Sequence, residues 1–252
     1  MNENRGAIVV GGAGGIGGAI CQRLGSEGYK VTVADYNLER AQEVARSLQG
    51  AGHHAVRVDV TDPVEVDAVF DGIEARDPAS VLVVATGGLL AIPAPGAKFT
   101  DMGTELWNSS IAYNLNGMFF CMRKFGALRI ANPVEHARII TITSGAGQFG
   151  GTPTDIAYVA SKAALIGMTR QVAYDLVDAG VTVNTIAPGP IGTPEFMRNT
   201  NEQVRAAAAR ITIMDRLGTT EEIAAGAAFL ASTEASYITG TTLDINGGSH
   251  MH

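Results

Sequence analysis

The sequence contains few cysteines and no grouping of them that suggests a bond or a metal. Cys21 and Cys121 lie far apart, without a Cys-x-x-Cys motif and without a nearby histidine. Disulfides belong mainly to oxidising compartments, and metal sites usually draw on ligands at short spacings. We therefore predict two buried free thiols, no disulfide and no metal site.

Long apolar runs and basic clusters are also missing. Gly, Thr or Asn interrupts every apolar stretch well before the ~20 residues that a membrane span requires. The 18 Lys and Arg residues are outnumbered by 25 Asp and Glu residues, and the formal net charge is −7. This charge opposes binding to nucleic acid or to an anionic membrane. The first residues lack the pattern of a signal peptide, so we expect a cytoplasmic protein.

Apolar segments alternate with segments of helical periodicity along the whole chain. Hydrophobic residues make up 46% and charged residues 17% of the sequence, which excludes global disorder. Strands are predicted at residues 6–10, 30–35, 55–60, 81–85, 138–143, 181–186 and 241–245. Helices are predicted from residue 16 to before Gly28, and at 38–49, 64–74, 104–131, 156–177, 201–209 and 220–231. This alternation, without a linker, predicts one α/β domain over residues 1–252, with a doubly wound, mostly parallel sheet.

A glycine-rich loop joins the first predicted strand to the first helix. It reads Gly11-Gly12-Ala13-Gly14-Gly15-Ile16-Gly17. Glycines let the backbone approach a pyrophosphate, whose charge the N-terminus of the helix favours. Asp35 ends the second strand, where a dinucleotide-binding unit places an acid against the adenosine ribose. Asp59 and Val60 end the third strand and suit a contact with the edge of adenine. The alternative is that Asp35 and Asp59 are turn residues, the latter preceding a helix cap.

A second group of polar residues comprises Ser144, Tyr158 and Lys162. Tyr158 and Lys162 are four residues apart at the start of a predicted helix, so they share one face. A tyrosine can exchange a proton with an alcohol or ketone if its pKa falls from ~10 toward ~7, about 4 kcal/mol of differential stabilisation. A nearby ammonium favours the phenolate. Without further context, the alternative is an ordinary pair on the surface of a helix.

The chain resembles the short-chain dehydrogenase/reductase family from about Gly6 to Gly248. The motifs that carry the resemblance, in order and approximate spacing, are the glycine-rich loop, Asp59-Val60, Asn114, Ser144, Tyr158-x3-Lys162 and Pro188-Gly189. The resemblance implies a Rossmann-type fold and an oxidoreductase that transfers a hydride between NAD and a secondary alcohol or ketone. The cofactor would carry the redox chemistry, and the protein would supply orientation and electrostatics.

The resemblance also implies roles for individual residues. Tyr158 would be the general acid/base, and Ser144 would hydrogen-bond the substrate oxygen. Lys162 would lower the pKa of Tyr158 and hold the nicotinamide ribose, and Asn114 would hold a relay water. The alternative for Asn114 is a polar residue that interrupts an apolar helix face. The expected cofactor-binding residues are Gly11, Gly14, Gly15, Ile16, Gly17, Asp35, Asp59, Val60, Gly87, Tyr158, Lys162, Pro188, Gly189, Ile191 and Thr193.

Two positions depart from the family pattern. The family's Thr before the first glycine is Val10 here, which removes a local hydrogen bond from the loop. The family's Asn-Asn-Ala-Gly after the fourth strand is replaced by Val84-Ala85-Thr86-Gly87. The missing Asn pair normally ties the sheet together, so its replacement alters a detail that stabilises the sheet in the family. Gly87 is retained and still allows a close approach to the cofactor.

The sequence favours NAD over NADP. The carboxylate of Asp35 can accept hydrogen bonds from two ribose hydroxyls, whereas a 2′-phosphate would bring like charges together. A cation that would bind this phosphate is expected at the position of Gly14 or directly after the acid, where this chain has Tyr36. Arg40 is the nearest basic residue along the chain, and we expect it to face solvent.

The substrate is expected to be a small molecule with apolar character. The loop Leu89-Leu90-Ala91-Ile92-Pro93, with Phe149, Phe196 and Met197, predicts an apolar pocket under a lid at about 189–215. The alternative is that these side chains only pack the lid against the body. Two other functions stay open. A 3-oxoacyl thioester reductase is disfavoured by the acidic charge and Asp35, and a non-catalytic NAD-binding protein by the presence of Tyr158 and Lys162.

A homotetramer is expected from the resemblance. The predicted long helix carries apolar residues beyond one core stripe, namely Trp107, Ile111, Leu115, Phe119 and Phe120. Relatives pair through this helix and the helix that carries Tyr158. His250 and His252 at the end of the chain have two interpretations, a frayed tail, which we favour, or an approach to a neighbouring subunit's site.

Overall fold

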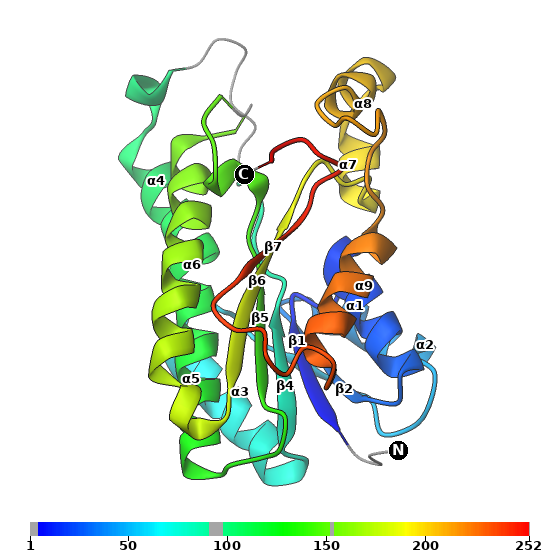
Figure 1. Cartoon of the computed structure of the whole chain (residues 1–252), viewed down its shortest axis with the longest axis vertical. Helices are drawn as coiled ribbons and strands as arrows, with labels where there is room; N and C mark the ends of the chain where they lie inside the picture. The colour runs from blue at the N-terminus through cyan, green and yellow to red at the C-terminus, as the bar shows by residue number, and fades with distance from the viewer. Residues whose placement is uncertain (1–4, 91–97, 152–153, 252) are drawn as a thin grey trace.

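One parallel sheet forms the centre of the molecule (Figure 1). The computed structural model describes residues 5–90, 98–151 and 154–251. Within them the strands are β1 (Gly6–Val10), β2 (Lys30–Asp35), β3 (His54–Arg57), β4 (Ala79–Val84), β5 (Arg138–Ile142), β6 (Thr182–Pro188) and β7 (Thr242–Ile245). Their order across the sheet is β3-β2-β1-β4-β5-β6-β7, and all neighbours are parallel. The strand order therefore reverses between β1 and β4, the point at which doubly wound sheets bind ligands.

Helices cover both faces of this sheet. One layer contains α1 (Gly15–Ser26), α2 (Leu38–Ser47) and α9 (Thr220–Ala231), and the other contains α3 (Pro63–Arg76), α5 (Gly117–Ala131) and α6 (Ile156–Asp175) (Figure 1). Each layer buries its own apolar cluster against the strands. Leu24 and Ile223 belong to the first cluster, and Phe70, Phe125 and Leu165 belong to the second. The predicted doubly wound α/β fold is confirmed.

The long helix predicted at 104–131 is interrupted. α4 (Thr104–Ile111) and α5 are separated by a π-helical turn, η2 (Ala112–Asn116). Asn114 lies in this turn and is buried. Periodicity does not reveal the interruption because apolar residues surround α5 on most sides. A π-helical turn often marks a functional position, because it redirects one side chain without ending the helix.

The third strand is shorter than predicted. β3 ends at Arg57, although the N–H of Val58 still donates to the carbonyl oxygen of Asp35 at 3.0 Å. The chain then turns, because the carboxylate of Asp59 accepts hydrogen bonds from both the N–H and the hydroxyl of Thr61. Residues 58–60 therefore belong to a loop at the edge of the sheet, where they can contact a ligand.

The two cysteines lie inside the apolar clusters, which confirms their predicted burial. Burial raises the pKa of the Cys121 thiol to about 12 and raises that of Cys21 further, so neither thiol is reactive near neutral pH. Across residues 5–90, 98–151 and 154–251, no helix combines the length and the apolar character that a membrane crossing needs.

Two further helices extend beyond the carboxyl ends of the strands. α7 (Pro194–Asn199) and α8 (Glu202–Ala209) follow β6 and project from the end of the molecule (Figure 1). Thr193 caps α7 by accepting a hydrogen bond from the N–H of Phe196 at 3.1 Å. Both helices fall within the segment 189–215 in which the sequence predicts a lid.

Candidate active site

Residues that follow four different strands meet at the carboxyl edge of the sheet. They line a cavity of about 150 Å³. Eight of its lining residues are site residues predicted from the sequence, namely Ile16, Gly87, Ser144, Tyr158, Lys162, Pro188, Gly189 and Ile191. The other lining residues are Ala85, Thr86, Ile142 and Thr143. The structure therefore places the Ser–Tyr–Lys group in one cavity with predicted cofactor-binding residues.

The start of α6 sets the positions of Tyr158 and Lys162. The carboxylate of Asp155 caps this helix by accepting a hydrogen bond from the N–H of Tyr158 at 2.8 Å. One turn later, the Nζ atom of Lys162 lies 5.6 Å from the centre of the Tyr158 ring. Ser144 follows β5, and its side chain hydrogen-bonds the Tyr158 hydroxyl. A reacting oxygen placed beside these two hydroxyls would contact both.

The pKa of Tyr158 is raised above its ordinary value in the protein alone. Burial of the phenol is the main cause, the hydrogen bond from Ser144 opposes it, and the negative charge of Asp155 adds to it. Lys162 is not among the causes of this shift, and its expected effect on the pKa of Tyr158 beside a bound cofactor stays a prediction. The Lys162 amine is directed instead at the carbonyl oxygen of Ile142, which it reaches at 3.0 Å.

Lys162 is an ammonium enclosed by the protein. Its residue is 2% exposed, and burial lowers the pKa of its amine to about 8. Gly87 provides the space: a Cβ atom there would lie 2.8 Å from Nζ, and the φ of Gly87 is +126°. Both facts require glycine at this position.

Asn114 connects the π-helical turn to the loop after β4. Its Oδ1 accepts a hydrogen bond from the N–H of Gly88 at 2.8 Å. Its Nδ2 donates to the carbonyl oxygens of Gly88 and Ser110, both at 3.1 Å. The side chain therefore links the π-helical turn to the loop after β4, and the relay water that the resemblance implies stays a prediction.

A second cavity, of about 520 Å³, lies on the β2–β3 side of the switch point. Gly11 lines it together with Asp35, Asp59 and Val60, the residues that the sequence analysis assigns to an adenosine contact. Tyr36, Thr86 and Leu90 are among its other lining residues. The Asp35 carboxylate accepts hydrogen bonds from the N–H groups of Ala13 and Asn37, each at 3.0 Å. A carboxylate has about four acceptor positions, so two remain for ribose hydroxyls. The bond to Ala13 also steadies the glycine loop, which Val10 cannot do.

The glycine loop has the shape of a phosphate cradle. A Cβ atom on Gly17 would collide with the carbonyl oxygen of Gly11, and one on Gly11 would lie 2.8 Å from the N–H nitrogen of Thr86. Gly14 precedes α1, and no side chain caps the backbone N–H groups of the first turn of this helix. Thr193 faces Gly15 from the other side, since a Cβ on Gly15 would lie 3.1 Å from the Cβ of Thr193. These residues fit a dinucleotide.

Arg40 is exposed, as the sequence predicts, and it also lines a cavity of about 420 Å³ together with Gly14 and Gly15. Arg198 of α7 lines the same cavity, and Glu195 and Glu221 place negative charge there. Arg40 therefore borders the glycine loop rather than pointing away from it.

Some contributors are not evident from the sequence. Thr86 lines both the cavity of about 150 Å³ and the cavity of about 520 Å³. Its buried hydroxyl has no hydrogen-bond partner in the described part of the chain. Its position directly before Gly87 was the available signal. Leu90 lines the nucleotide cavity, while Ala91, Ile92 and Pro93 lie outside the described residues.

His250 packs against the body of the molecule, whereas a frayed tail was predicted. The ring of His250 stacks on Phe149, with 4.7 Å between ring centres, and its carbonyl oxygen accepts a hydrogen bond from Asn246. His252 lies outside the described residues.

The fold and the Ser–Tyr–Lys geometry define a nucleotide-binding oxidoreductase of the Rossmann type. A family model described as enoyl-(acyl carrier protein) reductase matches residues 11–250. The chain belongs to the short-chain dehydrogenase/reductase family, whose members use a nicotinamide cofactor.

Relatives and a solved structure agree with this assignment. The chain is 35% identical to the 3-oxoacyl-[acyl-carrier-protein] reductase FabG of Escherichia coli K12, covering 99% of this chain and 98% of that protein. It is 36% identical to the 2,5-dichloro-2,5-cyclohexadiene-1,4-diol dehydrogenase LinX of Sphingobium indicum, covering 96% and 94%. The crystal structure of gox2181 superimposes with a TM-score of 0.90 at 29% identity, covering 98% and 96%.

Replacement of Gly87 tests the enclosure of Lys162. Gly87→Ala is expected to displace the ammonium and weaken cofactor binding at least tenfold, as measured by calorimetry, because the Cβ has no space at this backbone angle. Gly88→Ala is the matched control, since nothing lies within 4 Å of its added Cβ. Equal cofactor affinity in the two variants would contradict this account of Gly87.

Proposed function

We propose that this oxidoreductase transfers a hydride between NAD and a secondary alcohol or ketone. The observation that carries the proposal is the single cavity shared by Ser144, Tyr158, Lys162 and the loops that follow β4 and β6. When bound, the nicotinamide supplies or accepts the hydride. The protein contributes orientation, a proton and electrostatic stabilisation.

Tyr158 is the proposed general acid/base. In ketone reduction its hydroxyl donates a proton to the carbonyl oxygen, and in alcohol oxidation its phenolate accepts the proton. Ser144 hydrogen-bonds Tyr158 in the protein alone. In the proposed complex its single hydroxyl proton would turn to the substrate oxygen. The raised pKa of Tyr158 makes it a proton donor in the protein alone. The positive charges of Lys162 and of oxidised nicotinamide would lower that pKa and favour the phenolate that oxidation requires.

Tyr158→Phe is expected to lower kcat by a factor of about 10²–10⁴ while leaving the fold and cofactor affinity intact, because it removes only the transferable proton. Steady-state kinetics and calorimetry of cofactor binding measure the two effects. Tyr174→Phe is the matched control, since Tyr174 lies on the same helix and is 79% exposed. Turnover by Tyr158→Phe close to that of the control would remove Tyr158 from this role.

NAD is the proposed cofactor because of the charge around the adenosine cavity. Asp35 retains acceptor positions for ribose hydroxyls, and Asp59 lines the same cavity. A 2′-phosphate at ~4 Å from one carboxylate would cost about 4 kcal/mol at an effective dielectric near 20. Arg40 borders the glycine loop and is the residue most able to offset part of this cost.

NAD should be preferred over NADP by at least tenfold in kcat/KM, and Asp35→Ala should narrow the difference by removing the repelling charge. Initial rates with NAD and with NADP give the ratio of the two kcat/KM values. Asp35 also holds the N–H of Ala13, so the variant is expected to lose some affinity for both cofactors. Glu39→Ala, which removes an exposed acid from the first turn of α2, serves as control. Equal or better turnover with NADP would contradict the proposal.

The proposed substrate is a small molecule with apolar character, held under a lid at 189–215. LinX, by name a dehydrogenase of a cyclic diol, supports a secondary alcohol. The similarity to FabG supports the second candidate, reduction of a 3-oxoacyl thioester. The net charge of −7 disfavours docking of an acidic carrier protein. Parallel turnover assays with cyclic secondary alcohols and with 3-oxoacyl thioesters separate the two.

A homotetramer is the proposed assembly. Trp107 and Phe119 stay at the surface of α4 and α5, at 37% and 43% exposure. Leu115 and Phe120, which the sequence also suggested, pack instead against the chain's own core. Light scattering at micromolar concentration is expected to give the mass of four chains, because apolar faces of this kind favour association. A monomer in this range would refute the proposal.

A further inference from the structure

A cation lies at the rim of the adenosine cavity, although no basic residue stands next to Asp35 along the chain. β3 pairs with β2 so that Arg57 stands opposite Asp35, at the carboxyl ends of both strands. The guanidinium carbon of Arg57 lies 4.7 Å from the centre of the Tyr36 ring. Tyr36 lines the cavity together with Asp35 and Asp59. The residue directly after the acid is therefore covered by an arginine from the neighbouring strand.

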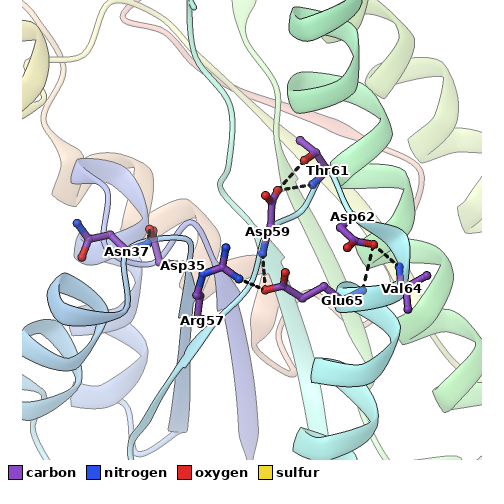
Figure 2. Close-up of polar contacts among 8 residues, drawn as sticks. All are labelled: Asp35, Asn37, Arg57, Asp59, Thr61, Asp62, Val64 and Glu65. Atoms are coloured by element: carbon purple, nitrogen blue, oxygen red, sulfur yellow. Dashed lines mark hydrogen bonds and ion pairs between the residues drawn. The ribbon is translucent and has the colours of Figure 1, made fainter.

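This arginine is held by Glu65. The Nη1 atom of Arg57 donates to Oε1 of Glu65 at 2.5 Å, and the same oxygen accepts a hydrogen bond from the N–H of Asp59 at 3.1 Å (Figure 2). The start of α3 fixes Glu65, because the carboxylate of Asp62 caps the helix by accepting from the N–H groups of Val64 and Glu65 (Figure 2). The carboxylate of Glu65 thus has a defined position between Arg57 and the loop of residues 58–60.

The pairing determines what Arg57 is able to bind. A free guanidinium presents several N–H donors and is well suited to a phosphate group. Here the hydrogen bond to Glu65 is the main cause of the raised pKa of Arg57, and Glu65 offsets the arginine's charge. A 2′-phosphate would have to compete with Glu65 for the guanidinium. The side chains are 44% and 28% exposed, so the pair can be separated without opening the core.

We propose that Glu65 is a specificity-determining residue that favours NAD by holding Arg57 away from a 2′-phosphate. Glu65 is a positioning residue, since it acts through Arg57 and not through contact with the cofactor. The proposal rests on the NAD preference proposed above. It predicts that release of Arg57 selectively improves binding of ligands that carry a 2′-phosphate.

The test compares two ligands that differ only in this group. Calorimetry measures the Kd of adenosine 2′,5′-bisphosphate and of adenosine 5′-monophosphate for the wild type, Glu65→Gln, Arg57→Met and the double variant. The side-chain amide introduced by Glu65→Gln keeps an oxygen for the N–H of Asp59, so the loop is preserved. Glu65→Gln is expected to bind the bisphosphate about tenfold more tightly, the size of one charge-assisted hydrogen bond, and the monophosphate within twofold of wild type.

The double variant decides whether Arg57 mediates the effect. Arg57→Met is expected to cancel the gain from Glu65→Gln, returning bisphosphate affinity to within twofold of Arg57→Met alone. Asp67→Asn is the matched control, because it removes the same charge from α3 but its partner is Arg123. No gain in Glu65→Gln, a gain that persists in the double variant, or an equal gain in Asp67→Asn would each overturn the proposal.

The outcome for Glu65 is distinguishable from the outcome for the cofactor. If the wild type binds the bisphosphate more tightly than the monophosphate, the proposed NAD preference is wrong. The proposal for Glu65 depends only on the change that each substitution makes and on its dependence on Arg57.

Discussion

The burial of one ammonium group is the constraint on which the site depends. Lys162 lies inside the protein, and its Nζ atom donates to the carbonyl oxygen of Ile142 at the end of β5. Because a buried charge needs polar partners and space, β5 must end beside α6 and Gly87 must lack a side chain. Asn114 holds the loop that contains Gly87 and Gly88. The end of β5, the start of α6 and the loop after β4 must therefore come together before the ammonium group is enclosed.

The glycine-rich loop and the cavity proposed for adenosine depend in a similar way on the carboxylate of Asp35. Asp35 accepts a hydrogen bond from Ala13 and so steadies the glycine loop that Val10, in place of the family's threonine, leaves without a local bond. The same carboxylate lines the cavity proposed for adenosine. A single group thus couples the shape of the phosphate loop to the charge at the ribose. Because of this coupling, we expect a change at Asp35 to affect both cofactor affinity and cofactor choice.

The site residues that this chain shares with its family do not specify the substrate. FabG and LinX match this chain at nearly equal identity, although their names describe an acyl thioester reductase and a cyclic diol dehydrogenase. In the proposed reaction the Ser–Tyr–Lys group acts only on the oxygen of the substrate, so it would not distinguish the rest of the substrate molecule. Selectivity must arise from the loops around it, as expected when a fold hosts many functions. The stacked rings of Phe149 and His250 contribute to this surrounding structure.

Local patterns in the sequence determined the alternation of strands and helices, the glycine loop and the shared face of Tyr158 and Lys162, because each depends on neighbours within a few residues. The packing of the complete chain decided the features of the site that local patterns do not contain. The π-helical turn at Asn114, the raised pKa of Tyr158 and the location of Thr86 between two cavities all depend on burial by distant segments. The position of Arg57 opposite Asp35 depends on strand register. Contacts across the sheet and the loss of solvent around a charge arise only when the whole chain is assembled, and no local pattern encodes them.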